Sequence, residues 1–426
     1  MFFGAALWDN QPDWIDFNKI QIPQADEQQH LLANMLTGTV PLVRLNFLPN
    51  GLKAAIVMTG DGHPGDYTQK QFQMYMDNIN SPAGCNTPGS ALVADWKCFR
   101  YTAYDNCDAL MTDATGNYSA PTASAAYNYQ KLGFEYAMHL DVGGVDYNPF
   151  TAGSSYFKPQ LDWFAAKYGP AGVLSPTTNR THNGAFVDYA SEPRAELDYG
   201  IQLDTTYFYW PGGNTPAGAP VPDWVQNRPG LFTGTGLIQP FADSDGRVVK
   251  RVTTEGKTLK SYQATTQVDD VSYLYPFENH FETLLGNATD TSKSYYTIVT
   301  ALCHLDDLGD FQQRCAWETS CAQAALTVAT AHGVPVVSAR QMLDWILARE
   351  NTAITYVVYS SGSLSFNLVN PAHNLQLMIP LAAGSRTLRS ISLGSKAVSY
   401  SSATIKGVNY ALVNQAAVGK YTVGYN

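Results

Sequence analysis

Side chains that can bind metals or transfer protons follow the carboxyl ends of four predicted strands. The four groups are Asp61 with His63, His139 with Asp141, Arg180 with His182, and His304. In α/β proteins ligands bind outside the carboxyl ends of the strands, which all lie on one face of a parallel barrel. Two histidines and one aspartate with an open coordination position fit a catalytic metal ion that polarises a carbonyl group and activates water. The remaining acid and histidine would act as general base and general acid.

Asp61 follows an unbroken apolar run at residues 54–58 (Ala-Ala-Ile-Val-Met). Such a run between turn residues predicts a strand buried on both faces. Gly60 and Gly62 flank the acid and allow backbone or ligand to approach closely. Taken alone, this segment fits a strand that ends in a polar turn equally well. A functional site is favoured because four of the eight histidines occupy strand ends, whereas a serine hydrolase is disfavoured because no Gly-x-Ser-x-Gly motif occurs.

Predicted strands and helices alternate from about residue 50 to residue 350, which calls for a mostly parallel sheet wrapped by helices. From Asn351 onward, short alternating runs separated by Gly and Ser predict a small all-β sandwich. We therefore expect three parts. These are a lead-in segment at 1–48, which would be the end of a longer N-terminal region, an α/β domain at 49–350, and the β-sandwich at 351–426.

The composition predicts a packed globular protein with few charges, since 45% of the 426 residues are hydrophobic and 15% are charged. A net charge of −10 argues against nucleic acid as a partner. No apolar run is long enough to predict a transmembrane helix. The chain is rich in Tyr and Trp, which suits sugar binding, and Tyr207, Tyr209 and Trp210 are a candidate sugar platform. Packing in the core or in a loop is the alternative for these three residues.

Six cysteines suggest disulfides and therefore a secreted or cell-wall-associated protein. Cys85 with Cys98 and Cys315 with Cys321 each bracket a short polar segment, and neither pair has zinc-knuckle spacing. The two remaining cysteines form a third pair, Cys107 with Cys303, or stay free thiols. Residues 1–7 lack the charged and apolar regions of a signal peptide, so an export signal would have to lie outside this sequence.

The order of several segments resembles the polysaccharide deacetylase family, the NodB-homology carbohydrate esterases. The matching segments are residues 22–29 (Ile-Pro-Gln-Ala-Asp-Glu-Gln-Gln), 59–63 (Thr-Gly-Asp-Gly-His), 179–182 (Asn-Arg-Thr-His) and 335–342 (Pro-Val-Val-Ser-Ala-Arg-Gln-Met). The chain is most similar to a secreted branch with a Thr-Gly-Asp-Asp-His motif. This branch includes fungal and bacterial deacetylases of exopolysaccharides of the galactosaminogalactan type. The resemblance implies a distorted seven- or eight-stranded (β/α) barrel that removes N-acetyl groups from an extracellular amino-sugar polysaccharide.

The resemblance also implies a role for each site residue. Asp61 corresponds to the general base, Arg180 to the arginine that orients this base, and His304 to the histidine that protonates the leaving amine. His139 and His182 correspond to ligands of a divalent metal ion, for which zinc is the expected identity.

Two positions depart from the family pattern. Gly62 replaces an acid that normally binds the metal, and Gly143 stands where many members carry a second histidine. His63 or Asp141 would have to complete the metal site, and the loss of a carboxylate ligand should lower metal affinity. Two alternatives follow. One is a catalytically impaired member that acts as a carbohydrate-binding protein, and the other is a glycoside hydrolase that uses Asp61 and Asp141 as its carboxylate pair.

Overall fold

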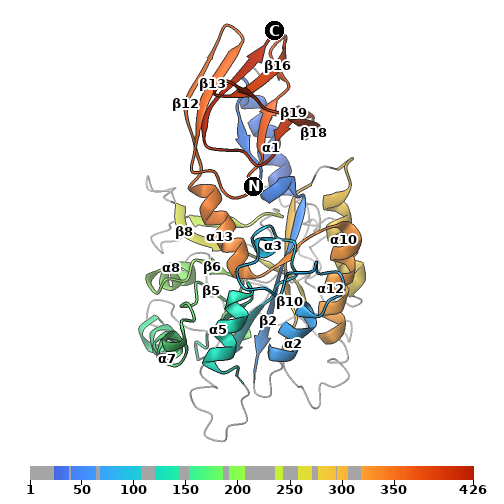
Figure 1. Ribbon diagram of the computed structural model, residues 1–426. Helices are drawn as coiled ribbons and strands as arrows, with labels where there is room; N and C mark the ends of the chain where they lie inside the picture. The colour runs from blue at the N-terminus through green and yellow to red at the C-terminus, as the bar shows by residue number, and fades with distance from the viewer. Residues whose placement is uncertain are drawn as a thin grey trace, which may run out of the picture.

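The computed structural model describes residues 24–37, 40–63, 68–106, 120–143, 153–185, 191–206, 236–242, 258–270, 277–293, 295–305 and 318–426. These residues form a mixed α/β part and a C-terminal part of antiparallel strands. Figure 1 shows the C-terminal part, in orange and red, above the α/β part.

The α/β part is built on one large sheet with the strand order β7-β8-β6-β5-β4-β3-β2-β10-β9, in which β11 also pairs with β2. The strands are β2 (Ala54–Gly62), β3 (Thr102–Asn106), β4 (Glu135–His139), β5 (Thr178–Asn179), β6 (Leu203–Asp204), β7 (Gln239–Ala242), β8 (Thr258–Gln263), β9 (Thr266–Asp269), β10 (Thr297–Leu302) and β11 (Val336–Val337). All pairings are parallel except that of β7 with β8. Within the described residues the edge strands β7 and β9 do not pair with each other, so the sheet is open there and no closed barrel is formed.

Strand β2 is an interior strand of the sheet, between β3 and β10, and is buried along its whole length, as its apolar sequence predicts. Its side chains alternate between two hydrophobic clusters. Ala54, Ile56 and Met58 pack into one, whereas Ala55 and Val57 pack into the other. Because successive side chains of a strand point to opposite faces, β2 has an apolar layer on each side.

Helices lie around this sheet, apart from the first along the chain, which lies beside the C-terminal strands and contacts Lys406 there (Figure 1). They are α1 (Gln24–Thr37), α2 (Thr68–Met76), α3 (Ala91–Ala94), α5 (Ala123–Lys131), α7 (Lys158–Tyr168), α8 (Ser191–Asp198), α10 (Phe277–Thr289), α12 (Glu318–His332) and α13 (Ala339–Glu350). Helix α13 begins at a capping box, in which the Ser338 side chain and the Gln341 side chain each bond to the other's backbone N–H. Helix α5 ends at Lys131, and Gly133, two residues later, has a φ of 90° that allows the chain to reverse into β4.

The C-terminal part contains two antiparallel sheets with the orders β12-β13-β20-β16-β15 and β1-β14-β19-β18, and β17 pairs with β16. Its strands are β12 (Ala353–Ser360), β13 (Ser363–Val369), β14 (Leu377–Pro380), β15 (Ala382–Ala383), β16 (Arg386–Leu393), β17 (Lys396–Ala397), β18 (Ser401–Ile405), β19 (Val408–Val413) and β20 (Gly419–Tyr425). The remaining strand, β1 (Arg44–Leu45), comes from the predicted lead-in segment and pairs with β14.

Two disulfides are present among the described residues. Cys85 pairs with Cys98, as predicted. Cys303 pairs with Cys321, so the predicted pairs Cys315–Cys321 and Cys107–Cys303 are wrong. Short loop length favoured Cys315 as the partner of Cys321. In the fold Cys303 follows β10, and its Cα lies 6.0 Å from that of Cys321 in the first turn of α12. Cys107 and Cys315 lie outside the described residues.

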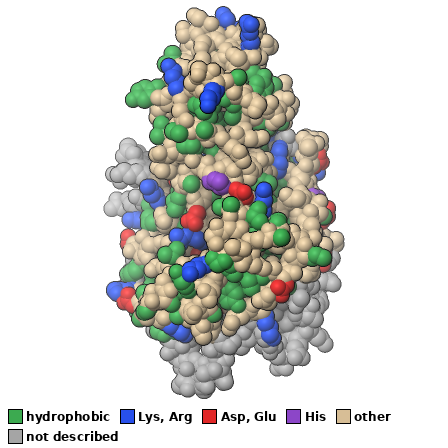
Figure 2. Space-filling view, in the orientation of Figure 1, with side chains coloured by type: hydrophobic (Ala, Val, Ile, Leu, Met, Phe, Trp, Pro, Cys, Tyr) green, Lys and Arg blue, Asp and Glu red, His purple; other side chains and the backbone are tan. Residues whose placement is uncertain are grey.

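Charged side chains are sparse on the face shown in Figure 2, where both signs are scattered and no continuous basic patch is visible among the described residues. None of the helices described has the length and apolar character needed to span a membrane.

Gly60 is required by close packing at the end of β2. A Cβ atom at this position would lie 1.7 Å from the Tyr101 hydroxyl and 2.1 Å from the backbone oxygen of Cys303. The Tyr101 hydroxyl donates a 2.6 Å hydrogen bond to that same oxygen, so both atoms are fixed. We expect Gly60→Ala to lower the free energy of unfolding by about 1–3 kcal/mol through overpacking, measured by urea denaturation.

Gly286→Ala is the matched control for this substitution. Its added Cβ would meet only His332 Cε1, at 3.9 Å. Because Gly286 lies inside α10, alanine should leave the stability unchanged or raise it by up to about 1 kcal/mol. Equal destabilisation by the two substitutions would contradict the packing described at Gly60.

The pairing of Cys303 with Cys321 predicts which peptides remain linked after digestion without reduction. Mass spectrometry should find the Cys303 and Cys321 peptides joined. Since this bond closes a sequence separation of 18 residues, Cys321→Ala should destabilise the protein by about 3 kcal/mol. Cys315→Ala serves as the control and should leave the Cys303–Cys321 linkage intact. A peptide that joins Cys315 to Cys321 would refute the assignment.

Candidate metal centre

Six of the seven predicted strand-end residues, all but Asp141, line one cavity of about 240 Å³ at the carboxyl ends of the parallel strands. The lining includes Asp61, His63, His139, Arg180, His182 and His304. Four strands, or the turns that follow them, supply these six residues. Asp61 lies near the end of β2 and His63 just after it, His139 ends β4, Arg180 and His182 follow β5, and His304 follows β10. Parallel pairing therefore brings together residues that are up to 243 positions apart in the sequence.

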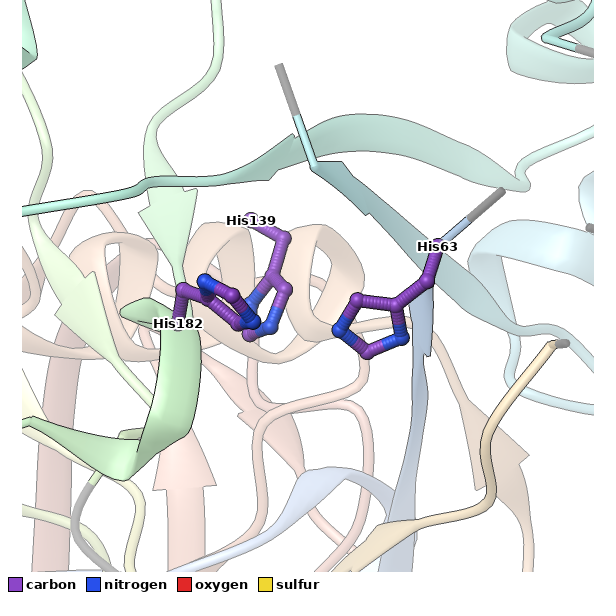
Figure 3. A group of neighbouring side chains, drawn as sticks. All are labelled: His63, His139 and His182. Atoms are coloured by element: carbon purple, nitrogen blue, oxygen red, sulfur yellow. The ribbon is translucent and has the colours of Figure 1, made fainter. Parts of the chain in front are cut away.

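Three imidazole rings converge in this cavity (Figure 3). His63, His139 and His182 each offer a nitrogen, and these three atoms lie within 4.8 Å of one another. The ring centroids are 5.0 Å apart for His139 and His182, and 5.3 and 5.2 Å from His63 to these two. Imidazole nitrogens at this spacing are a donor set suited to zinc.

Hydrogen bonds orient two of the three rings. His139 Nδ1 lies 2.7 Å from the backbone oxygen of Arg180, and His182 Nδ1 lies 2.7 Å from Asp141 Oδ2. In both pairs Nδ1 must donate, because the partner is an acceptor, which leaves Nε2 of each ring as the nitrogen available to a metal. This arrangement is typical of metal-binding histidines, whose outer nitrogen donates to a carbonyl or a carboxylate.

His139 is neutral at physiological pH. Its complete burial lowers its pKa to about 3. The nearby His63 and His182 lower the pKa as well, whereas the negative charge of Asp61 raises it. A histidine must be neutral to bind a metal, so no proton has to be displaced from His139.

Asp61 forms a buried ion pair with Arg180. The Arg180 Nη1 atom lies 3.0 Å from Asp61 Oδ1, and the other carboxylate oxygen lies 3.7 Å from His139 Nε2. Burial raises the pKa of Asp61, but Arg180 and the histidines around it lower the pKa to about 2. Asp61 is therefore an ionised carboxylate beside the three imidazoles.

His304 is paired with an acid that the sequence analysis missed. His304 Nδ1 lies 2.6 Å from Asp270 Oδ1, and the His304 backbone N–H donates to Asp270 Oδ2 at 2.5 Å. The Asp270 side chain is only 4% exposed. Asp270 follows the carboxyl end of β9, and the acid pair Asp269-Asp270 after a short polar–apolar run was the available signal. Two contacts therefore fix the His304 ring.

Asp141 and Gly143 lie behind His182 in the structure. Asp141 accepts the His182 Nδ1–H, and the hydrogen bond from His182 lowers the pKa of this carboxyl group. A Cβ at Gly143 would lie 2.4 Å from the Tyr156 hydroxyl, so a histidine at this position would displace that ring. Asp141 therefore orients a candidate ligand and is not part of the three-nitrogen group. The candidate sugar platform, Tyr207, Tyr209 and Trp210, falls outside the described residues.

Comparisons with known proteins add little to this geometry. No family model matches the chain, and no curated protein sequence matches it. Among solved structures, Agd3, titled a novel carbohydrate deacetylase, aligns at 11% identity over 96% of this chain and 70% of that chain, with a TM-score of 0.38. The family 30 xylanase Xyn30A from Clostridium acetobutylicum aligns at 6% identity over 87% and 96% of the two chains, with a TM-score of 0.29. An α-fucosidase from Thermotoga maritima aligns at 10% identity over 89% and 97%, with a TM-score of 0.25. These similarities are too weak to carry an argument about activity.

The Asp141–His182 contact predicts how zinc affinity responds to mutation. Asp141→Asn should weaken zinc binding about 10–100-fold, because the His182 ring loses the acceptor that orients it. His182→Ala should weaken binding more, since a ligand is then removed. Competition with a chromophoric chelator measures both affinities. Asp162→Asn, which alters an exposed aspartate on α7, is the control. Equal losses for Asp141→Asn and His182→Ala would indicate instead that Asp141 binds the metal itself.

Proposed function

We propose that this chain is a metal-dependent hydrolase that removes N-acetyl groups from an extracellular amino-sugar polysaccharide. The observation that carries the proposal is the arrangement of three groups around one cavity. Three convergent imidazoles lie beside an ionised acid held by Arg180, and a histidine held by Asp270 faces the same space. Amide hydrolysis needs a site for a metal ion that polarises the carbonyl group, a general base and a general acid, and these three groups could supply them.

The residues present fit a zinc ion. His139 and His182 would bind it through Nε2, since Nδ1 of each is already hydrogen-bonded, and His63 would supply the third nitrogen in place of the acid missing at Gly62. When bound, zinc would polarise the acetamide carbonyl and make a nucleophilic water available near neutral pH. Three histidines with an open fourth position are a known donor set of catalytic zinc sites.

The remaining groups account for the proton transfers. Asp61 is ionised and would accept the proton of the attacking water, while Arg180 fixes its orientation. The water oxygen bonds to the acetyl carbon, and the carbon–nitrogen bond then breaks. The amine leaves with the Nε2 proton of His304, which would act as the imidazolium cation with its Nδ1–H held by Asp270, so one proton passes to Asp61 and one leaves His304 in each turnover. The products are acetate and a free amino sugar.

The size of the cavity supports a reaction at a side group of a polymer. Pockets that enclose a whole drug-sized ligand usually hold about 300–1,000 Å³, and this cavity holds about 240 Å³. An acetamide group would enter it, and the sugar chain would lie outside. The two disulfides fit a secreted protein that meets such a polymer outside the cell. The fold that we propose together with this activity is the distorted barrel of the deacetylases. The open sheet seen in the described residues would then be part of that barrel.

The two alternatives differ in their support. A glycoside hydrolase needs one carboxylic acid that stays protonated, whereas the pKa values of Asp61 and Asp141 are both lowered. A carbohydrate-binding protein without activity is favoured by Gly62, where a carboxylate that would neutralise a bound cation is missing, and by the candidate sugar platform at Tyr207, Tyr209 and Trp210, which falls outside the described residues. This second alternative is the rival that an experiment must separate from the hydrolase.

Acetate release from a partly acetylated hexosamine polymer tests the proposal. The zinc-loaded protein should release acetate, and a chelator should stop the release. Asp61→Asn should lower kcat about 10²–10⁴-fold, because the base is lost while the shape of the side chain is kept. Zinc content should stay unchanged in this variant, since Asp61 lies outside the three-nitrogen group. Saturable glycan binding by the zinc-loaded protein, without any acetate release, would establish the binding protein instead.

A further inference from the structure

A second cluster of ionisable side chains lies on the other side of β5 from the cavity. It consists of Glu192 and Glu196 on α8 and Asp204 at the end of β6, elements that lie together in Figure 1. One oxygen from each carboxylate lies within 4.8 Å of the other two, and all three residues are 0% exposed. Glu192 and Glu196 face the same side of α8 because they are four residues apart.

Neutral donors hydrogen-bond to all three carboxylates, and in Asp204 both oxygens accept, since Oδ1 takes the Thr206 backbone N–H at 3.1 Å. Asn179 Nδ2 donates to Glu196 Oε1 at 2.6 Å, the Thr181 hydroxyl donates to Glu192 Oε1, and the Thr206 hydroxyl donates to Asp204 Oδ2 at 2.6 Å. Carboxylates that bind metals are commonly held in this way by outer hydrogen bonds. These donors orient the acids and add no positive charge to the cluster.

The second oxygen of Glu196 points to a missing ligand. Glu196 Oε2 is fully buried, and no donor group of the described residues hydrogen-bonds to it; the side chain within hydrogen-bond reach of the Glu196 carboxyl group is that of another acid, Asp204. Buried carboxylate oxygens are nearly always satisfied by a donor or a cation, because burial without a partner is costly. This oxygen belongs to a residue whose carboxylate already faces two other acids.

We propose that Glu192, Glu196 and Asp204 bind a calcium ion that fastens α8 to β6 and to the back of β5. Carboxylate oxygens are the ligands of hard cations, whereas the imidazoles of the cavity suit zinc, so the two sites select different metals. Calcium fits better than magnesium because magnesium usually keeps several water molecules, and the three acids are fully buried. The site goes beyond the proposed hydrolase activity, and its role is structural.

A proton is the rival occupant of this cluster. Burial raises the pKa of Glu196 well above its usual range, and the nearby Asp204 and Glu192 raise it further. A protonated Glu196 would donate to Asp204 and lower the repulsion without any metal. Calcium and a proton can be told apart by experiment. Only calcium would be detected as a metal bound to the protein, and only calcium would be removed by a chelator.

Calcium binding to the full chain tests the proposal. The protein is first stripped with a chelator, then dialysed against Ca²⁺ alone, and its metal content is measured by inductively coupled plasma mass spectrometry. We expect one calcium ion per chain and a rise in Tm of about 4 °C or more at saturating Ca²⁺, because binding stabilises only the folded state. Glu196→Gln and Asp204→Asn should abolish both effects.

Two controls separate the sites. His139→Ala, which removes a candidate zinc ligand, should keep its calcium, and Glu278→Gln, at an exposed position on α10, should behave as the wild type. If the cluster variants fail to fold, calcium binding by the wild type alone decides the question. A folded wild type that retains no calcium, together with an unchanged or higher Tm for Glu196→Gln, would overturn the proposal in favour of a shared proton. Because calcium and zinc are counted separately, failure here leaves the hydrolase proposal intact.

Discussion

Arg180 holds the site together, because this one residue contacts four strands, three of them (β2, β4 and β6) at or just after their carboxyl ends and β9 at its start. Its guanidinium group donates to Asp61 at the end of β2, to Thr266 at the start of β9, and to the backbone oxygen of Thr205, which follows β6. Its own backbone oxygen accepts from His139 at the end of β4. The side chain is 3% exposed, so removing either partner of the ion pair would leave a buried charge at a cost of about 3–5 kcal/mol. Such a residue fixes both the charge state of the acid and the orientation of a candidate metal ligand.

The segment that contains Arg180 separates two chemically different clusters. Arg180 and His182 line the cavity, whereas Asn179 and Thr181 hydrogen-bond to the buried acids on the other side. This division follows from the extended backbone, in which successive side chains point to opposite faces. The histidine-rich front and the carboxylate-rich back are therefore parts of one structure, and the acids behind β5 help to position the residues in front of it.

The sequence predicted the residues of the cavity better than the contacts between them. A buried strand before Asp61 and histidines after later strands were enough to place six predicted residues around one cavity, since parallel pairing puts strand ends on one face. Asp270 escaped prediction because β9 is short and follows β8 closely, so its periodicity does not stand out. The partner of Cys321 also depended on the packing of α12 against β10, and the distance along the chain gave no guide to it.

The pairing of β1 with β14 determines which fragments of the chain can fold on their own. Residues 44 and 45 form an edge of the C-terminal sheet, and Asn46 bonds to Gln376 through both backbone and side chain. Arg349, at the end of α13, donates to the backbone oxygens of Leu45 and Asn46. A fragment that starts after α13 would expose the unpaired edge of β14, a surface on which strands of other molecules can add. The β-rich part is therefore discontinuous in sequence, and a soluble fragment of it must include the segment that carries β1.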